Sequence, residues 1–177
     1  MNCTGKGFIQ VYTGNGKGKT TAAFGLALRA AGAGMKIFIV QLMKDYPYSE
    51  LESLQRLQPE IELEHFGNDA FVFRKEPPGK EDLHAARQAL VRGRQAMLSG
   101  QYDLVVFDEI CVAIYFGLLS VQDVLKLMDE KPVIVELILT GRYCPAEIIT
   151  RADLVSEMRE VKHYYQQGVM ARKGFEC

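Results

Sequence analysis

Short apolar runs alternate with stretches of helical periodicity along the whole chain. Runs too short for helices, and apolar at nearly every position, are typical of strands that are buried on both faces of a sheet. They predict strands at residues 8–12, 36–41, 61–66, 104–107, 133–139 and 154–158. Between them, the spacing of apolar residues predicts helices at residues 20–33, 49–57, 81–99 and 120–129, and Pro145 can open a short further helix. Alternating strands and helices form right-handed βαβ units, so we expect an α/β fold with a mostly parallel sheet flanked by helices.

Length, charge and cysteine usage limit the classes of protein that fit. A chain of 177 residues suits one domain over residues 1–177, and its net charge of −1 favours neither nucleic acid nor an anionic membrane as a partner. Residues 110–119 form the longest apolar run, which is too short to cross a bilayer. The four cysteines show no zinc spacing, which favours free thiols in a cytoplasmic protein; they are Cys3, Cys111, Cys144 and Cys177.

Residues 13–21 form a glycine-rich segment between the first predicted strand and the first predicted helix. A loop that turns its amides toward a phosphate needs glycines, and the helix that follows directs its positive end at the anion. In such a loop Lys19 would neutralise phosphate charge and the Thr20 hydroxyl would bind Mg²⁺. The generic motif has its first glycine where this chain has Thr13, so the loop is a variant. The predicted ATP-binding residues are Thr13, Gly14, Asn15, Gly16, Lys17, Gly18, Lys19, Thr20 and Thr21.

Two acids, Asp108 and Glu109, follow the apolar run at residues 104–107. Adjacent carboxylates at the end of a buried strand are costly unless a metal or a base compensates them. With Thr20 they form the predicted metal-binding set, although a solvated strand end is the alternative. Arg142 follows another predicted strand, at the edge of the sheet where ligands gather in α/β folds, and we expect it to contact ATP unless it is an ordinary surface arginine.

The phosphate loop also carries a more specific resemblance. Residues 13–25 resemble the signature of the ATP:corrinoid adenosyltransferases of the CobA/CobO/BtuR type. The match continues in the family's order over nearly the whole chain, at residues 27–32, 40–41, 106–109, 140–142, 152–158, 161–163 and 173–176. The chain is identified on these motifs as a member of that family.

The resemblance implies a P-loop NTPase fold of the RecA-like kind, a homodimer, and Mg²⁺ or Mn²⁺ as cofactor. It implies transfer of the 5′-deoxyadenosyl group of ATP to the Co(I) centre of a reduced corrinoid, with release of triphosphate. The corrinoid would be cob(I)yrinic acid a,c-diamide, cobinamide or cobalamin, and a reductase or flavoprotein would supply the electron. Lys17, Lys19 and Arg29 would neutralise the triphosphate. The catalytic candidates are Lys19, Arg29 and Glu109.

Phe71 and Phe73 fall where the family shows a Phe-x-Trp pair, and the chain contains no Trp. The family uses such aromatics against the lower face of the corrin ring, so the resemblance implies that both phenylalanines contact the corrinoid. They lie in a long predicted loop at residues 67–80, and long loops tend to be functional. The alternative is that both rings pack back onto the sheet.

Two other classes of P-loop protein remain open from the residues. In an ATP-hydrolysing switch or motor, Glu109 would activate water. In a small-molecule kinase, Lys17 would neutralise the migrating phosphoryl group. A kinase generally has an arginine-rich lid, whereas the long loop holds only Arg74, Lys75 and Lys80 as basic residues.

Overall fold

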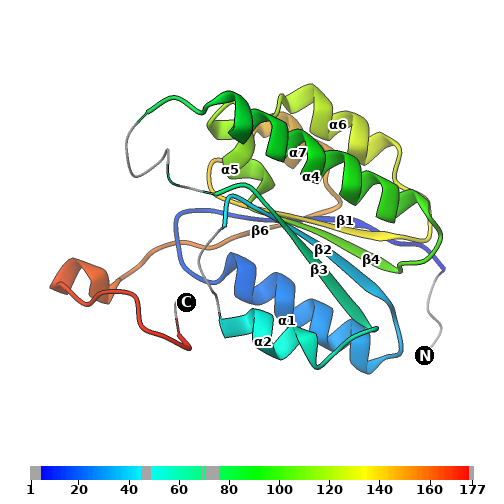
Figure 1. Ribbon diagram of the computed structural model, residues 1–177, viewed down its shortest axis with the longest axis horizontal. Coiled ribbons are helices and arrows are strands. Elements are labelled where there is room, and N and C mark those ends of the chain that lie inside the picture. Colours follow the sequence, from blue (N-terminus) through cyan, green and yellow to red (C-terminus); the bar gives the residue numbers. More distant parts are fainter. Residues whose placement is uncertain (1–4, 45–48, 69, 71–75, 176–177) are drawn as a thin grey trace.

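The structure is a computed structural model that describes residues 5–44, 49–68, 70 and 76–175. Its centre is a six-stranded sheet in the order β3-β2-β4-β5-β1-β6, with every neighbouring pair parallel (Figure 1). The strands are β1 (Ile9–Thr13), β2 (Ile37–Leu42), β3 (Ile61–Phe66), β4 (Leu104–Asp108), β5 (Glu136–Thr140) and β6 (Leu154–Glu157). The parallel α/β class predicted from the sequence is therefore confirmed.

Helices cover both faces of the sheet (Figure 1). On one face lie α1 (Lys19–Gly32) and α2 (Ser49–Gln55). On the other face lie α4 (Lys80–Leu98), α5 (Ile110–Tyr115), α6 (Val121–Asp129) and α7 (Ala146–Arg151). After β6 the chain leaves the sheet and forms a 3₁₀ turn, η1 (Tyr164–Gln167). Within the described part of the chain, no helix is both long and apolar enough to span a membrane.

Alternate residues of the central strands enter two separate cores. In β4, Leu104 and Val106 pack toward α1 and α2, whereas Val105 and Phe107 pack toward α4 to α7. All four are nearly or fully buried. Burying such side chains stabilises the fold by roughly 1.5–3 kcal/mol each, which explains why these strands are apolar at every position.

Helix α4 approaches the sheet at a glycine. A Cβ atom on Gly93 would lie 2.2 Å from the Cζ atom of Phe107, so the helix can pack at this distance only because residue 93 has no side chain. Helix α6 begins at Val121, one residue after the start predicted from the sequence, and Ser120 caps it. Ser120 accepts a hydrogen bond from the amide of Asp123, and the Asp123 carboxylate accepts one from the amide of Ser120.

Helix α5 and strand β5 differ from the sequence prediction, and η1 was not predicted either. Helix α5 was not predicted, because residues 110–115 are apolar around most of the helix and show no helical period; Ile110, Cys111 and Ala113 are buried. Strand β5 begins at Glu136 rather than at residue 133. Val133 and Ile134 instead form an exposed turn, in which their side chains are 68% and 69% accessible.

Because all strands are parallel, their carboxyl ends lie at the same edge of the sheet. The order places β5 between β1 and β4, with β2 next to β4. The loop after β1, the acids at the end of β4 and the turn after β5 therefore lie side by side. Ligands of open α/β sheets bind at this edge.

Candidate active site

The glycines of the predicted phosphate loop meet two different structural requirements. Gly14 and Gly18 adopt φ angles of 97° and 114°, which strain any residue with a side chain. Gly16 is required by close packing instead. Its amide donates a hydrogen bond of 2.6 Å to the carbonyl oxygen of Met158, and a Cβ atom at Gly16 would lie 2.8 Å from that oxygen. The segment that follows β6 thus forms one wall of the loop.

Lys19 is the first residue of α1 and is 7% accessible. Its Nζ atom donates a hydrogen bond of 2.7 Å to the carbonyl oxygen of Gly16, so the ammonium group is folded back onto the loop. Burial lowers the pKa of Lys19, the carboxyl of Glu109 opposes that shift, and the charge of Arg142 reinforces it. A partly desolvated ammonium group beside a second cation provides a favourable place for a polyphosphate.

Asp108 is the centre of the site and is fully buried. Its Oδ1 atom accepts hydrogen bonds from the hydroxyls of Thr20 at 2.9 Å and Thr140 at 2.7 Å. Its Oδ2 atom accepts from the Nε2 atom of Gln41 at 3.1 Å and from the Nζ atom of Lys44 at 2.8 Å. The carboxylate therefore joins the phosphate loop to the ends of β2, β4 and β5.

The charge of Asp108 is stabilised by these partners. Burial alone would raise the pKa of this carboxyl, but the ammonium group of Lys44 and the hydrogen bonds from Lys44, Thr140 and Gln41 outweigh it and hold the pKa below its ordinary value. Asp108 is therefore ionised at neutral pH. A buried carboxylate that is ionised and fully bonded can position the groups around it.

Glu109 has the opposite environment. Burial raises its pKa, and the neighbouring charge of Asp108 raises it further, against the opposing effects of Lys44, Lys19 and Arg142. Its backbone has a φ of 66°, and its amide donates a hydrogen bond of 2.9 Å to the hydroxyl of Thr140. Left-handed backbone in a residue with a side chain costs about 1–3 kcal/mol and is found preferentially at functional sites.

The oxygen atoms around Asp108 fit a hard cation such as Mg²⁺. Carboxylate, hydroxyl and amide oxygens are the ligands that such ions prefer. The Lys44 ammonium already lies between two of them, at 2.8 Å from Asp108 and 3.3 Å from the Thr20 hydroxyl. The Oε1 atom of Gln41 is buried and has no hydrogen-bond partner among the described residues. Those residues contain no cluster of three or more His, Cys, Asp or Glu suited to a metal, so phosphate or water oxygens would have to complete a coordination shell.

The structure brings some predicted residues to this site and separates others. Arg142 is exposed in the turn after β5, near enough to act on Lys19 and Glu109. Arg29 lies in the last turn of α1, about 15 Å along the helix axis from Lys19, so one chain does not bring it to the loop. Lys17 is exposed and donates a hydrogen bond of 2.8 Å to the carbonyl oxygen of Phe175 in the C-terminal segment.

The remaining loop residues differ in exposure. Thr13 is buried, whereas the side chains of Asn15 and Thr21 are exposed. Phe71 and Phe73 lie outside the described residues, so their expected contact with a corrinoid stays a prediction.

Three residues around Asp108 had no role in the sequence analysis. Gln41 and Thr140 are polar residues at the carboxyl ends of otherwise apolar strands, and both are fully buried. A polar residue in that position can be recognised from the sequence as a site candidate. Once buried it needs a hydrogen-bond partner, and the acids lie at the same edge of the sheet. Lys44 is harder to find, since it follows β2 in a segment without a motif.

Cys111, which lies near the site beside Cys144, is a thiol rather than a nucleophile. A hydrogen bond with the Cys144 sulfur, followed by burial, raises the pKa of Cys111 far above its ordinary value. Both cysteines are free, as predicted for the described pair. Because a thiol reacts only as its thiolate, Cys111 is not suited to covalent catalysis.

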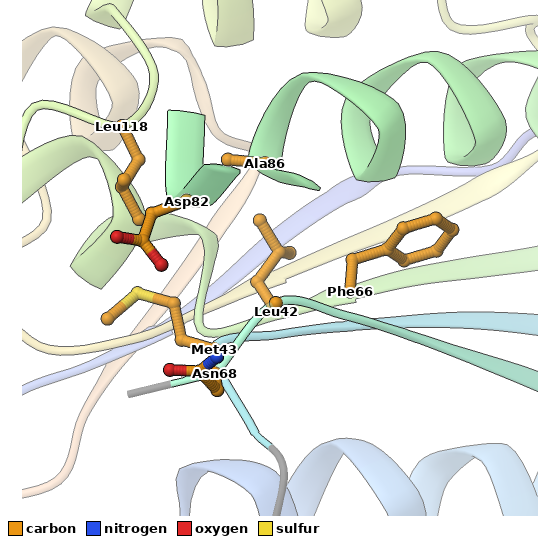
Figure 2. A pocket seen from close by; sticks show the side chains of 8 residues that line it. Leu42, Met43, Phe66, Asn68, Asp82, Ala86 and Leu118 are labelled. Atoms are coloured by element: carbon orange, nitrogen blue, oxygen red, sulfur yellow. The ribbon is translucent and has the colours of Figure 1, made fainter. Parts of the chain in front are cut away.

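A small, mainly apolar hollow lies at the carboxyl ends of β2 and β3 (Figure 2). Met43, Asp82 and Leu118 gather at one end of it, while Leu42 and Phe66 lie toward the other. It is on the α4 side of the sheet, and Gly67 and Asn68, which directly follow β3, contribute to its lining. The edge that carries the phosphate loop thus also has an apolar part.

Comparison with known proteins identifies the family. The sequence model of the family described as ATP:corrinoid adenosyltransferase BtuR/CobO/CobP matches residues 5–177. The chain belongs to this family. Curated relatives named corrinoid adenosyltransferase include those of Escherichia coli K12 and Salmonella typhimurium LT2. Each is 36% identical over 173 residues, covering 97% of this chain and 86% of the relative. The Pseudomonas aeruginosa relative is 34% identical over 171 residues, covering 97% and 84%.

The fold of this corrinoid adenosyltransferase family member is shared with a solved structure of a KaiC-like protein from the archaeon Pyrococcus horikoshii. The TM-score is 0.56 with 17% sequence identity, and the match covers 89% of this chain and 75% of the other. At that identity the likeness concerns the fold alone. It agrees with the P-loop NTPase fold that the family resemblance implied.

Proposed function

We propose that this chain transfers the 5′-deoxyadenosyl group of ATP to the Co(I) centre of a corrinoid and releases triphosphate. The observation that carries the proposal is the constellation of Lys19, Thr20 and Asp108 at the carboxyl edge of the sheet, in a chain matched by the family model over residues 5–177. Named relatives from three bacteria support the substrate class.

In the proposed reaction the phosphate loop holds the leaving group. Cobalt supplies the electron pair that forms the Co–C5′ bond, and the pair of the broken C5′–O bond remains on the triphosphate. Charge therefore accumulates on the phosphate oxygens. The loop amides, the N-terminus of α1 and the ammonium of Lys19 are arranged to stabilise that charge. Arg142, exposed beside them, adds a further cation in the proposal.

Thr20, Asp108 and Glu109 are the residues that would hold Mg²⁺ or Mn²⁺ in the proposal. A divalent ion bound there would neutralise phosphate charge. The ammonium group of Lys44 contacts the Thr20 hydroxyl and the Asp108 carboxylate in this structure, so it is a second cation that would lie close to bound phosphates. Glu109, next to Asp108, completes the acidic side of the metal site. The proposed attack by cobalt needs no general base, so we assign Glu109 a role with the cation rather than with a proton.

We also propose a homodimer that works in the cytoplasm with a separate reductase or flavoprotein, as the family resemblance implies. Arg29 lies too far from the phosphate loop of its own chain to contact ATP there. In the proposal it could act only on ATP bound to the other subunit of the dimer. Phe71 and Phe73 remain the proposed contacts to the lower face of the corrin ring.

One anaerobic assay separates this function from ATP hydrolysis and from phosphoryl transfer. Purified protein, ATP and Mg²⁺ are mixed with a chemically reduced corrinoid, and the light-sensitive Co–C product is followed by absorbance. We expect product formation that depends on ATP and is lost in Lys19→Ala. Orthophosphate release without corrinoid would instead support an ATPase. Formation of ADP with a phosphorylated small molecule would support a kinase.

A further inference from the structure

A pair of stacked tyrosines stands exposed at the carboxyl edge of the sheet. Tyr115 ends α5, and Tyr143 lies in the turn after β5. Their ring centroids are 4.2 Å apart with 27° between the ring planes, and the two residues are 58% and 51% accessible. Phe116 adds a third ring, edge-on to Tyr115 at 5.2 Å. Clusters of exposed aromatic side chains are characteristic of ligand-binding and protein-interaction surfaces.

The backbone of Tyr143 supports a role for its side chain. Its φ is 59°, in the left-handed region, where a bulky residue costs about 1–3 kcal/mol and glycine costs little. A tyrosine placed there is strained and half exposed at the same time. Strain without burial brings no benefit to folding, and strained residues gather at ligand-binding positions.

The tyrosine pair is part of the edge that holds the phosphate loop. Tyr143 directly follows Arg142, and α5 begins directly after Glu109. Gly141 fixes the two segments together, because a Cβ atom there would lie 2.9 Å from the Cβ atom of Cys111. Figure 1 shows α5 at the same end of the sheet as the loop before α1, but on the opposite face.

We propose that Tyr115 and Tyr143 form a contact surface for the corrinoid. The proposal rests on the proposed function and assigns a surface to its larger substrate. The phosphate loop and α1 hold the nucleotide from the other face of the sheet, so the macrocycle has to lie across the open edge. A corrin is much wider than a nucleotide and reaches past the mouth of the site. Its apolar rim and its amide side chains suit a pair of aromatic rings that carry hydroxyl groups.

The test is Tyr143→Gly, with Tyr115→Ala as a second variant. Affinity for cob(II)inamide is measured by absorbance with ATP and Mg²⁺ present, and affinity for ATP is measured separately by calorimetry. We expect Tyr143→Gly to weaken corrinoid binding about tenfold, with a matching rise in the corrinoid KM, because a covered ring is lost. ATP affinity should stay within twofold. The melting temperature should be unchanged or higher, because glycine relieves the left-handed backbone.

Phe8→Ala is the matched control, since it removes an exposed ring at the opposite edge of the sheet and should leave both affinities unchanged. Unaltered corrinoid affinity in Tyr143→Gly overturns the proposal. A parallel loss of ATP affinity overturns it in favour of stacking on adenine, and a change of oligomeric state overturns it in favour of a subunit contact. Wild-type protein that binds cob(II)inamide but forms no Co–C product would contradict the proposed function. The corrinoid affinities of the wild type and Tyr143→Gly could still be compared in that case.

Discussion

Lys44→Met tests the charge balance around Asp108. The Nζ atom of Lys44 lies 2.8 Å from the Oδ2 atom of Asp108, and the two side chains are 12% and 0% accessible. Methionine keeps most of the length and the apolar stem but removes the charge. The buried carboxylate then retains its hydrogen bonds from Thr20, Thr140 and Gln41. Among the described residues, Lys44 is the only one that forms an ion pair with Asp108, so the ionised carboxylate loses that partner in the variant.

The size of the effect follows from this geometry. Removing one partner of a buried ion pair costs about 3–5 kcal/mol. The three remaining hydrogen bonds place this case near the lower end, so we expect a loss of about 3 kcal/mol in the free energy of unfolding at pH 7. For a chain of this size that corresponds to a drop of roughly 6–12 °C in the melting temperature.

The loss should depend on pH with a definite sign. In the wild type, the pKa of Asp108 is held below its ordinary value, so its contribution to stability is present at neutral pH and disappears as the pH falls through the acid range. In the variant, burial prevails and the pKa lies above its ordinary value, so protonation relieves the cost as the pH falls. The stability difference between the two proteins should therefore be largest near pH 7 and shrink toward pH 4.

Urea unfolding of the nucleotide-free protein measures both quantities. Lys36→Met is the control, since it removes an exposed lysine outside the site and should change stability by less than about 0.5 kcal/mol. Asp108→Asn in the Lys44→Met background should restore part of the loss, because the unpaired charge is gone. A Lys44→Met variant as stable as the control, or a stability difference that does not vary with pH, would refute this description of the site.

Three further substitutions, with Gly25→Ala as a control, test the loop and the aromatics. Gly16→Ala should lose about 1–3 kcal/mol of stability and bind ATP more weakly, because its Cβ atom would meet the Met158 carbonyl at 2.8 Å. Gly25→Ala, which meets no atom within 4 Å, should be neutral or stabilising in the same unfolding assay. Lys19→Ala should abolish ATP binding in calorimetry while its circular dichroism stays folded; unchanged affinity would exclude the loop assignment. Phe73→Ala should slow transfer to Co(II)-derived corrinoid more than to pre-reduced Co(I), and equal slowing would exclude a role in displacing the axial ligand.

The fold was predictable where one physical pattern dominated. Residues 104–107 of β4 are all apolar because alternate residues enter two cores, and no other short element requires that. Helix α5 was not predicted because residues 110–115 are nearly all apolar and lack the polar face by which an amphipathic helix is recognised; Ile110, Cys111 and Ala113 are buried. The start of β5 was placed too early because apolar side chains at Val133 and Ile134 resemble a strand while they lie in an exposed turn.

The candidate site was predictable only where residues are adjacent in the sequence. The phosphate loop and the pair Asp108–Glu109 stand in continuous motifs. Lys44 reaches Asp108 because β2 and β4 are neighbours in the sheet, and strand order cannot be read from a motif. Arg29 is the converse case, a residue close to the loop in sequence but distant from it in space. It lies in the last turn of α1, whereas the loop precedes the first turn.

Phosphorus NMR of a complete anaerobic reaction identifies the group that leaves when the Co–C bond forms. With ATP, Mg²⁺ and excess reduced cobinamide, we predict one intact triphosphate for each Co–C bond formed, and none when the corrinoid is left out. Pyrophosphate and orthophosphate as the primary products, or triphosphate released without corrinoid, would contradict it.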